Sequence, residues 1–200
     1  NTLSFNVLIS IFSIMREIEI IWQIYCFFSN FVCKNKCVNM RRSDREITDR
    51  KEIMEIIGRC DVCRLAFNDD VEGIPYILPL NFGYEEDADG CVTLYFHGAT
   101  EGYKYDVIAR DPRAAFEMDC DHRLASNRER GYCTMEYSSV IGRGRIEIIT
   151  DREQKIRALT ILTDNYHAKH FEYNPKAVDR TTVMALKVEK MTAKQRKVKG

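Results

Sequence analysis

A histidine, two glycines, a hydroxyl group and a lysine stand close together near the middle of the chain. The segment reads His97-Gly98-Ala99-Thr100-Glu101-Gly102-Tyr103-Lys104. Glycine lets the backbone approach a ligand closely, and the free N–H groups at the start of a helix favour negative charge. Lys104 adds a mobile positive charge. The segment therefore predicts an anion site of the phosphate-binding kind, although it matches neither the dinucleotide glycine fingerprint nor the P-loop.

Predicted strands lead into this segment, and a predicted helix leads out of it. Apolar residues recur along the strands 77–82 and 92–96, and the acidic, glycine-ended stretch 85–90 between them is typical of a hairpin loop. A helix is predicted over Tyr103–Arg110, with Pro112 just beyond its end. The anion site would thus lie where a sheet gives way to a helix.

The rest of the chain predicts a sheet with helices at its margins. Asp49 to Gly58 indicates a short amphipathic helix, and the capping box Thr150–Glu153 opens a second one. The polar stretch 119–131 predicts a long exposed loop, whereas Gly142 and Gly144 indicate a bulge or a bend within a strand. The remaining predicted strands cover residues 60–67, 114–118, 132–149 and 181–188.

Three blocks of the sequence resemble a known family. They read PLNFGYE, LYFHGATEGYKYDVIARDPRAAFE and YSSVIGRGRIEI, in this order. Together they resemble the FMN-binding split-barrel superfamily, which includes the pyridoxamine 5′-phosphate oxidases, from Met40 to Val188. The closest likeness is to the nitroimidazole-resistance branch, through the FHGA-type histidine and the SVIG-type strand. The resemblance implies a mainly β fold with flanking helices (α+β), a six-stranded antiparallel split β-barrel of the FMN-binding type.

The resemblance also implies a flavin site. FMN, or FAD in its place, would have its phosphate at Thr100, Gly102 and Lys104 and its ring edge along the strand that ends at Phe82. His97 would deliver a proton to the acceptor, and the SVIG-type segment lies close to the flavin in the family. The expected cofactor contacts are Pro79, Leu80, Asn81, Phe82, His97, Gly98, Ala99, Thr100, Gly102, Lys104, Ser138, Ser139, Val140 and Ile141.

The implied function is that of an FMN-dependent oxidoreductase of the nitroreductase type. It would reduce small acceptors such as nitroaromatics, with NAD(P)H as the electron donor, and it would form a homodimer because the flavin of this fold sits at a dimer interface. Oxidation of pyridoxamine phosphate is disfavoured, since an Arg-x-His type of motif is missing from 181–200. The alternative is a flavin- or haem-binding split-barrel module without its own turnover, in which His97, His122, His167 or His170 would ligate the haem.

Composition gives no sign of a nucleic-acid or metal partner. The chain has 30 basic and 30 acidic residues and no formal net charge, so steering towards polyanions is not expected. Of its 8 cysteines, Cys60 and Cys63 lack the second pair that a structural zinc site needs. His167 and His170 lack a third ligand, so no metal site is expected. The thiols are interpreted as structural and reduced, which indicates a cytoplasmic protein.

The chain divides into three parts by composition. Residues 1–39 are interpreted as an apolar N-terminal extension that lies outside the native domain. The longest uncharged run on their C-terminal side is about fourteen residues, short of the roughly twenty that span a bilayer as a helix. The alternative is a membrane anchor that basic residues hold on the cytoplasmic side; without it, no stable membrane partner is expected. Residues 40–190 are predicted to be the FMN-binding domain, and residues 191–200 a basic C-terminal tail.

Overall fold

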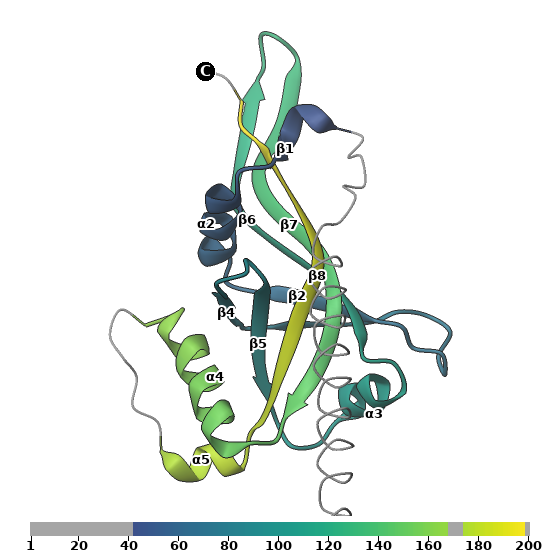
Figure 1. Cartoon of the computed structure of the whole chain (residues 1–200). Coiled ribbons are helices and arrows are strands. Elements are labelled where there is room, and N and C mark those ends of the chain that lie inside the picture. Colours follow the sequence, from purple (N-terminus) through teal and green to yellow (C-terminus); the bar gives the residue numbers. More distant parts are fainter. Residues whose placement is uncertain (1–41, 168–173, 199–200) are drawn as a thin grey trace, which may run out of the picture. The chain divides into compact units, whose positions relative to one another are not determined.

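The computed structural model describes residues 42–167 and 174–198 (Figure 1). The predicted extension at 1–39 and His170 lie outside these residues. All of the described residues belong to one compact unit, Asn39–Gly200. No helix within the described ranges is long and apolar enough to cross a membrane.

Strands make up most of the described chain, and short helices flank them. The helices predicted from Asp49 and over Tyr103–Arg110 are confirmed, and the first ends at Arg59, one residue after the predicted stop at Gly58. The side chain of Asp49 caps this helix by accepting a hydrogen bond from the backbone N–H of Glu52 at 2.8 Å. In chain order the elements are η1 (Ser43–Arg45), β1 (Glu46–Ile47), α2 (Arg50–Arg59), β2 (Cys63–Phe67), β3 (Tyr76–Leu80), β4 (Gly83–Glu86), β5 (Val92–Gly98), α3 (Tyr103–Arg110), β6 (Arg113–Asn127), β7 (Tyr132–Ile149), α4 (Arg152–Asp164), α5 (Pro175–Asp179) and β8 (Thr182–Arg196).

The strands of the described chain join one antiparallel sheet. They follow the order β3-β2-β6-β7-β8-β5-β4, and β1 pairs with β8. The mainly β, α+β class is confirmed, but the sheet has eight strands where six were expected, and it is open because β3 and β4 do not pair with each other. The two additional strands are β1, which has 2 residues, and β4, which has 4 residues. Both are too short to show a periodic pattern in the sequence.

The hairpin before the candidate site differs from the prediction. β4, and not the predicted strand 77–82, pairs with β5, so that Gly83 lies opposite Tyr95. The predicted strand corresponds to β3, which pairs with β2 at the other end of the sheet. Three Cα steps separate Leu80 from Gly83, so the two ends of the sheet are at most roughly 11 Å apart at this corner. The sheet must therefore curl until its ends come close together.

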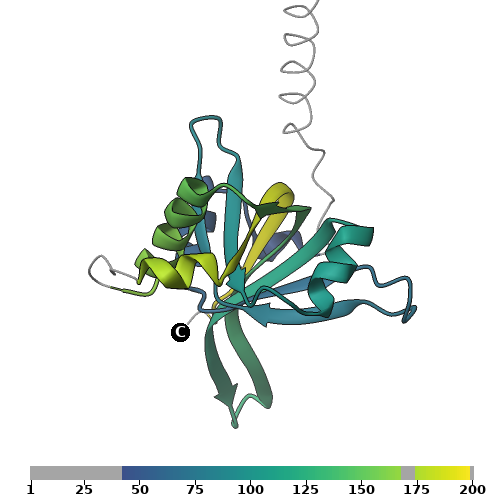
Figure 2. The same cartoon turned by 90° about the horizontal axis from the view of Figure 1, so that it is seen from below.

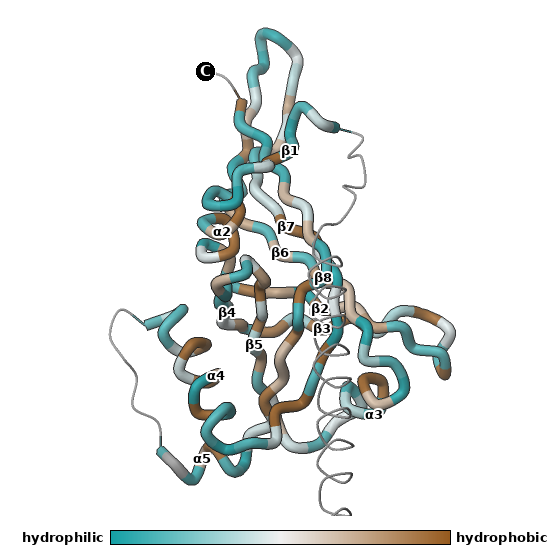
Figure 3. Tube along the Cα trace, viewed as in Figure 1, coloured by the Kyte–Doolittle hydropathy of each residue, from teal (hydrophilic) through white to brown (hydrophobic). Residues whose placement is uncertain are grey.

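The segment predicted as an exposed loop at 119–131 is mainly strand. β6 continues to Asn127, and residues 128–131 make the turn into β7. The two strands form an arm that projects beyond the rest of the sheet in both views (Figures 1 and 2). Side chains on both faces of the arm are largely exposed, and its tip is hydrophilic (Figure 3). A strand that buries neither face lacks the apolar alternation by which strands are predicted.

The last strand is longer than predicted. β8 runs to Arg196 and not only to Val188, because it pairs with β7 as far as Tyr137. The pairing register shifts between Arg143 and Gly144, which confirms the irregularity predicted at the glycines of β7. A side chain at Gly144 would place its Cβ only 2.0 Å from the carbonyl oxygen of Lys187. The absence of a side chain therefore lets β7 and β8 approach each other here.

Aromatic side chains fill the core on the inner face of the sheet. Cys63, Leu65 and Phe67 are buried along one face of β2, as predicted. α2 closes one side of this core with its isoleucines, and α4 packs tightly on β4. A Cβ at Gly83 would lie 2.5 Å from the Cα of Leu162. The largest fully buried aromatic residues are Phe67, Phe82, Phe96 and Phe116.

Candidate functional site

The segment His97–Lys104 lies at the junction of β5 and α3. His97 is exposed and pairs with Val183 next to the end of β5. α3 begins at Tyr103, and its N-cap is Gly102, which has a φ of 139° and gives no side-chain cap. Glycine adopts this backbone conformation readily. The first N–H groups of α3 thus have no capping side chain, as an anion site requires.

The ammonium group of Lys104 lies over the two glycines of the segment. A Cβ at Gly98 would lie 3.1 Å from Lys104 Cε, and a Cβ at Gly102 would lie 3.3 Å from Lys104 Nζ. The same Nζ is 4.3 Å from the centre of the Tyr105 ring. No carboxylate of the described residues pairs with Lys104. Its positive charge is therefore available to an anion held between the glycines and the start of α3.

Two tyrosines fix the start of α3. The hydroxyl of Tyr105 donates a hydrogen bond to the carbonyl oxygen of Ala99 at 2.5 Å. The hydroxyl of Tyr103 donates to Asp69 at 2.7 Å, and Arg110 donates to the same carboxylate at 3.1 Å. Asp69 is only 2% exposed. Sequence reasoning missed this clamp; its one local signal was that Tyr103 and Arg110 lie two helical turns apart on one face of the helix.

Hydrogen bonds hold the pKa of Asp69 below its ordinary range. Burial acts to raise the pKa, but the Tyr103 hydroxyl and the backbone N–H groups of Val71 and Glu72 donate to the carboxylate and outweigh that effect. Asp69 is therefore ionised at neutral pH. Its charge anchors α3 to the loop between β2 and β3.

The polar groups predicted to meet the flavin ring edge already have partners within the chain. The Asn81 side chain donates to the carbonyl oxygen of Asp61 at 3.1 Å. The backbone N–H of Phe82 donates to the hydroxyl of Tyr166 at 2.9 Å, and its carbonyl accepts from Asn165 at 3.2 Å. The Phe82 side chain belongs to the core. Leu80 is half-buried against this core, and Pro79 is exposed.

The SVIG-type segment on β7 splits between two faces of the sheet. Ser138 and Val140 are fully buried on the inner face. Ile141 is 48% exposed on the outer face. The hydroxyl of Ser139 is buried on the same outer side and has no hydrogen-bond partner in the described structure. Because a buried hydroxyl is normally hydrogen-bonded, Ser139 is the member of this segment with a donor and an acceptor to offer.

The predicted contacts form two separate groups. His97 pairs with Val183 on β8, whereas Ser139 pairs with Lys194 on the same strand. The stretch of β8 between these two partners is about 36 Å long at 3.3 Å per residue. FMN is much shorter than that. One chain therefore does not bring Ser139 to a flavin that is bound beside His97.

Pro79 and Ile141 lie on the same face of the sheet. The register places Pro79 opposite Arg64, Arg64 opposite Glu117, and Glu117 opposite Ile141. Residues in one such row point to the same side of a sheet. Three strand spacings separate the ends of the row, about 14 Å. Sequence order alone could not show this row, because it depends on the order of the strands.

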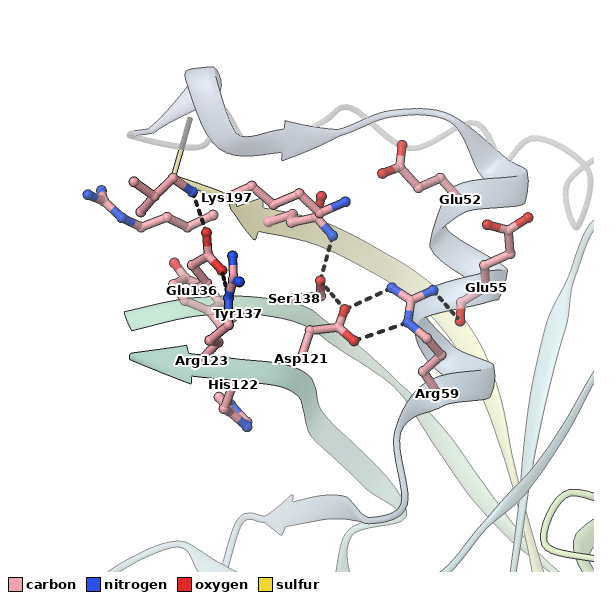
Figure 4. Close-up of a pocket in the computed structure, with 13 residues that line it drawn as sticks. Glu52, Glu55, Arg59, Asp121, His122, Arg123, Glu136, Tyr137, Ser138 and Lys197 are labelled. Carbon is pink, nitrogen blue, oxygen red and sulfur yellow. Dashed lines mark hydrogen bonds and ion pairs between the residues drawn. The ribbon is translucent and has the colours of Figure 1, made fainter. Parts of the chain in front are cut away.

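A polar pocket of ≈ 660 Å³ opens between α2, the arm and the end of β8 (Figure 4). Arg59 donates to Asp121 from Nε at 3.3 Å and from Nη2 at 2.9 Å, and Ser138 donates to the same carboxylate at 2.7 Å. These contacts lower the pKa of Asp121 to about 2, and the hydrogen bond from Arg59 has the largest effect. Gln195 in turn donates to the Ser138 hydroxyl at 2.7 Å. Ser138 thus links Asp121 on β6 to Gln195 on β8 and is not turned towards the outer face.

No group of three or more metal-ligating side chains occurs in the part of the chain that the structure describes. Cys60 and Cys63 are both buried and free, and burial raises the pKa of Cys63 to about 12. His122 lies on β6, not in a loop, with Nε2 2.7 Å from Asp119 Oδ2.

Comparison with known proteins gives one family and a set of similar structures. The model of the pyridoxamine 5′-phosphate oxidase family matches residues 49–195. A candidate 5-nitroimidazole antibiotic resistance protein from Bacteroides thetaiotaomicron is 34% identical, with a TM-score of 0.65, and the match covers 75% of this chain and 86% of that chain. No curated protein sequence matches the chain.

Two more distant structures share the fold. The flavocytochrome Anf3 from Azotobacter vinelandii is 19% identical, with a TM-score of 0.66, and the match covers 80% of this chain and 73% of that chain. The FAD- and haem-binding protein from Mycobacterium smegmatis is 21% identical, with a TM-score of 0.64, and the match covers 77% of this chain and 74% of that chain. At this level of identity the likeness concerns the fold alone.

Proposed function

Because the chain belongs to the pyridoxamine 5′-phosphate oxidase family, we propose that it is a flavin-dependent oxidoreductase that reduces a small acceptor. The 34% identity to the Bacteroides protein favours an acceptor of the nitroimidazole type. The observation that carries the proposal is the unpaired ammonium of Lys104 over Gly98 and Gly102, at a helix start with no side-chain cap. This is a site for the phosphate of FMN.

The residues at this junction fit a phosphate group by charge and by space. Thr100 would donate its hydroxyl, Lys104 its ammonium, and Gly102 and the start of α3 their backbone N–H groups. Gly98 leaves room, since a side chain there would contact Lys104 Cε and the Tyr105 hydroxyl, the latter at 3.2 Å. The bound flavin would supply electron transfer between NADH or NADPH and the acceptor.

His97 is proposed as the proton donor. It precedes Gly98 directly, and its side chain is exposed at the end of β5. An imidazole exchanges its proton near neutral pH, so His97 could protonate the acceptor as it is reduced. The role requires that the imidazole reach the acceptor at the flavin ring.

A second copy of the chain is proposed to complete the site. The partners of Ser139 and Ile141 on β8 lie too far from the partner of His97 for these two residues to serve the same chain's flavin. On the outer face, Ile141 belongs to the row that ends at the exposed Pro79, about 14 Å away, and Ile77 is exposed two residues before Pro79. Apolar surface of this kind is typical of an interface. We therefore propose a homodimer in which the outer face of one copy contributes the SVIG-type segment to the flavin of the other.

The absorption spectrum of the purified protein tests the proposed function. We expect flavin bands, their bleaching during an anaerobic titration with NADH or NADPH, and their return when a nitroimidazole is added. A Soret band in their place would instead indicate a haem-binding module. A flavin that neither nicotinamide reduces would contradict the proposed donor.

The role of His97 is tested separately. The His97→Ala variant should retain its flavin and lose about 100-fold or more in turnover, the usual contribution of a general acid. His122→Ala is the matched control, since His122 is also exposed and lies on another strand. Unchanged turnover of His97→Ala with full flavin content would remove this residue from the mechanism.

A further inference from the structure

Two thiols far apart in the sequence converge on one backbone carbonyl. Cys60 caps the C-terminus of α2, and Cys120 lies on β6. Sγ of Cys60 is 3.3 Å from the carbonyl oxygen of Ile56, and Sγ of Cys120 is 3.9 Å from the same oxygen. The separation of the two sulfur atoms cannot exceed the sum of these distances. Both thiols are free in the structure.

The residues next to the two cysteines hold the segments side by side. Arg59 precedes Cys60 and Asp121 follows Cys120, and these two residues form an ion pair at 2.9 Å (Figure 4). The pairing of β6 with β7 is interrupted between Cys120 and Arg123. The bulge already interrupts the strand pairing after Cys120. A movement of Cys120 towards Cys60 would therefore disturb the ladder hydrogen bonds on one side of this residue only.

The surroundings distinguish the two thiols. Cys60 is 2% exposed, whereas Cys120 is half-buried beside the pocket that Arg59 and Asp121 line. Burial raises the pKa of both thiols, but the hydrogen bond between them acts to lower the pKa of Cys120 and to raise that of Cys60. The thiolate forms more readily at Cys120, which is also the more accessible sulfur.

We propose that Cys60 and Cys120 form a reversible disulfide when the protein meets a peroxide. Cys120 gives up its proton, and its thiolate attacks a peroxide oxygen; an S–O bond forms, the O–O bond breaks, and the hydroxide or alkoxide that leaves takes up the proton as water or an alcohol. Cys60 then attacks the sulfur of this sulfenic acid; the S–S bond forms, the S–O bond breaks, and water leaves. The two thiols lose two electrons in total, and a dithiol reductant restores them.

The proposed pair is not Cys60 with Cys63, its near neighbour in the sequence. Cys63 is fully buried on the core face of β2, and the structure holds its side chain in the core. The proposed bond would join α2 to β6 next to Asp121, the residue that holds Ser138 of the SVIG-type segment. Oxidation would therefore act on the strand that the proposed interface uses, although the disulfide itself does not depend on a flavin.

Peptide mapping of the full chain tests the proposal. The reduced protein is treated with hydrogen peroxide under native conditions, remaining thiols are alkylated, and the digest is analysed by mass spectrometry. We expect a linked pair of peptides that contain Cys60 and Cys120, lighter by two hydrogens than the separate peptides and separated again by dithiothreitol. Oxidation should also raise the melting temperature, because the bond closes a long loop.

Two variants complete the test. Cys120→Ser should lose both the linked peptide and the rise in melting temperature, and Cys133→Ser, which alters an exposed cysteine of the same arm, should keep both. The choice of the half-buried Cys120 avoids the buried Cys60, whose replacement could prevent folding. A link between Cys60 and Cys63, or oxidation of Cys120 to sulfinic acid without any link to Cys60, would overturn the proposal.

Discussion

At the level of single residues, charge pairing distinguishes Lys104 at the candidate phosphate site from three arginines of the fold. Arg59, Arg110 and Arg157 each bind a carboxylate, so their charges stabilise the fold. Lys104 has an aromatic ring beneath it and no carboxylate partner in the described part of the chain. The interaction of an ammonium with a ring is weak when it is exposed to water. An anion that binds here therefore need not displace an internal partner.

Asp121 gives a prediction about the pH dependence of stability. Arg59 and Ser138 hold its pKa at about 2, below the unperturbed value of 3.8, so its ionised form stabilises the folded state. This contribution is present above about pH 4 and is lost as the pH falls towards about 2. Asp121→Asn should lower the free energy of unfolding by about 1 kcal/mol at neutral pH, the scale of a partly exposed ion pair.

Urea unfolding at several pH values measures this effect. Asparagine tolerates the positive φ of 60° at position 121, so the variant changes the charge and keeps the bulge. The difference between the variant and the wild type should shrink as the pH falls from 4 to 2. An equal difference at pH 7 and pH 2 would show that the charge does not matter.

At the level of elements, β6 combines two kinds of strand. Its first half supplies the core, where Phe116 is 2% exposed, and its second half supplies the arm, where Leu124 is 63% exposed. One continuous strand thus carries both a structural and a projecting part. The bulge at Cys120 to Arg123 marks the point where its role changes.

This division predicts unequal effects of similar substitutions. Phe116→Ala should lower the free energy of unfolding by about 3–5 kcal/mol, because it removes a buried ring and leaves a cavity. Leu124→Ala should change it by less than about 0.5 kcal/mol, since the side chain is exposed. Chemical denaturation of the two variants under the same conditions provides the comparison. Similar losses of stability in both would mean that the arm packs against something in solution.

Local signals in the sequence were sufficient for some elements and insufficient for others. The capped helix α2, the helix α3 and the strand β7 follow from caps, breakers and strand propensity, and all three were predicted at nearly their observed limits. The arm was missed because neither of its faces is buried. The strand β4, which begins after the predicted strand ends, follows Phe82, and Asn165 and Tyr166 bind Phe82 across more than eighty residues of sequence.

The same distinction applies to the candidate site. The glycines, the hydroxyl and the lysine of residues 97–104 are consecutive, so their common location follows from the sequence. The clamp of Tyr103 and Arg110 on Asp69 could not be predicted, because it requires the loop between β2 and β3 to lie next to α3. The separation of Ser139 from His97 likewise depends on the pairing of both strands with β8.

At the level of the whole molecule, the proposed function needs two copies of the chain. The outer face presents Ile77 and Ile141, which are 62% and 48% exposed. Between them lie the charged Arg64 and Glu117, which pair with each other at 3.0 Å, and Arg64 also binds Asp119 at 2.6 Å. Such a surface can be buried in an interface with little loss of solvation for unpaired groups.

Ile141→Glu tests this interface. Sedimentation of the wild type should give twice the chain mass of 23.4 kDa, and the variant should dissociate at least about 30-fold more readily, as for a central interface residue. Val71→Glu, at a side chain that is 67% exposed on the loop between β2 and β3, is the matched control and should remain dimeric. A wild-type protein that carries flavin as a monomer would contradict the proposed second copy.

The affinity for FMN of the Lys104→Glu variant tests the central claim most directly. Fluorescence titration of the flavin-free protein should show binding at least about 30-fold weaker than in the wild type, as expected when one member of a charge pair is lost. Lys51→Glu reverses the charge of a side chain on α2 that is 87% exposed, and it should bind FMN as the wild type does. If Lys104→Glu bound FMN as tightly as the wild type, the phosphate site would not lie between His97 and Lys104.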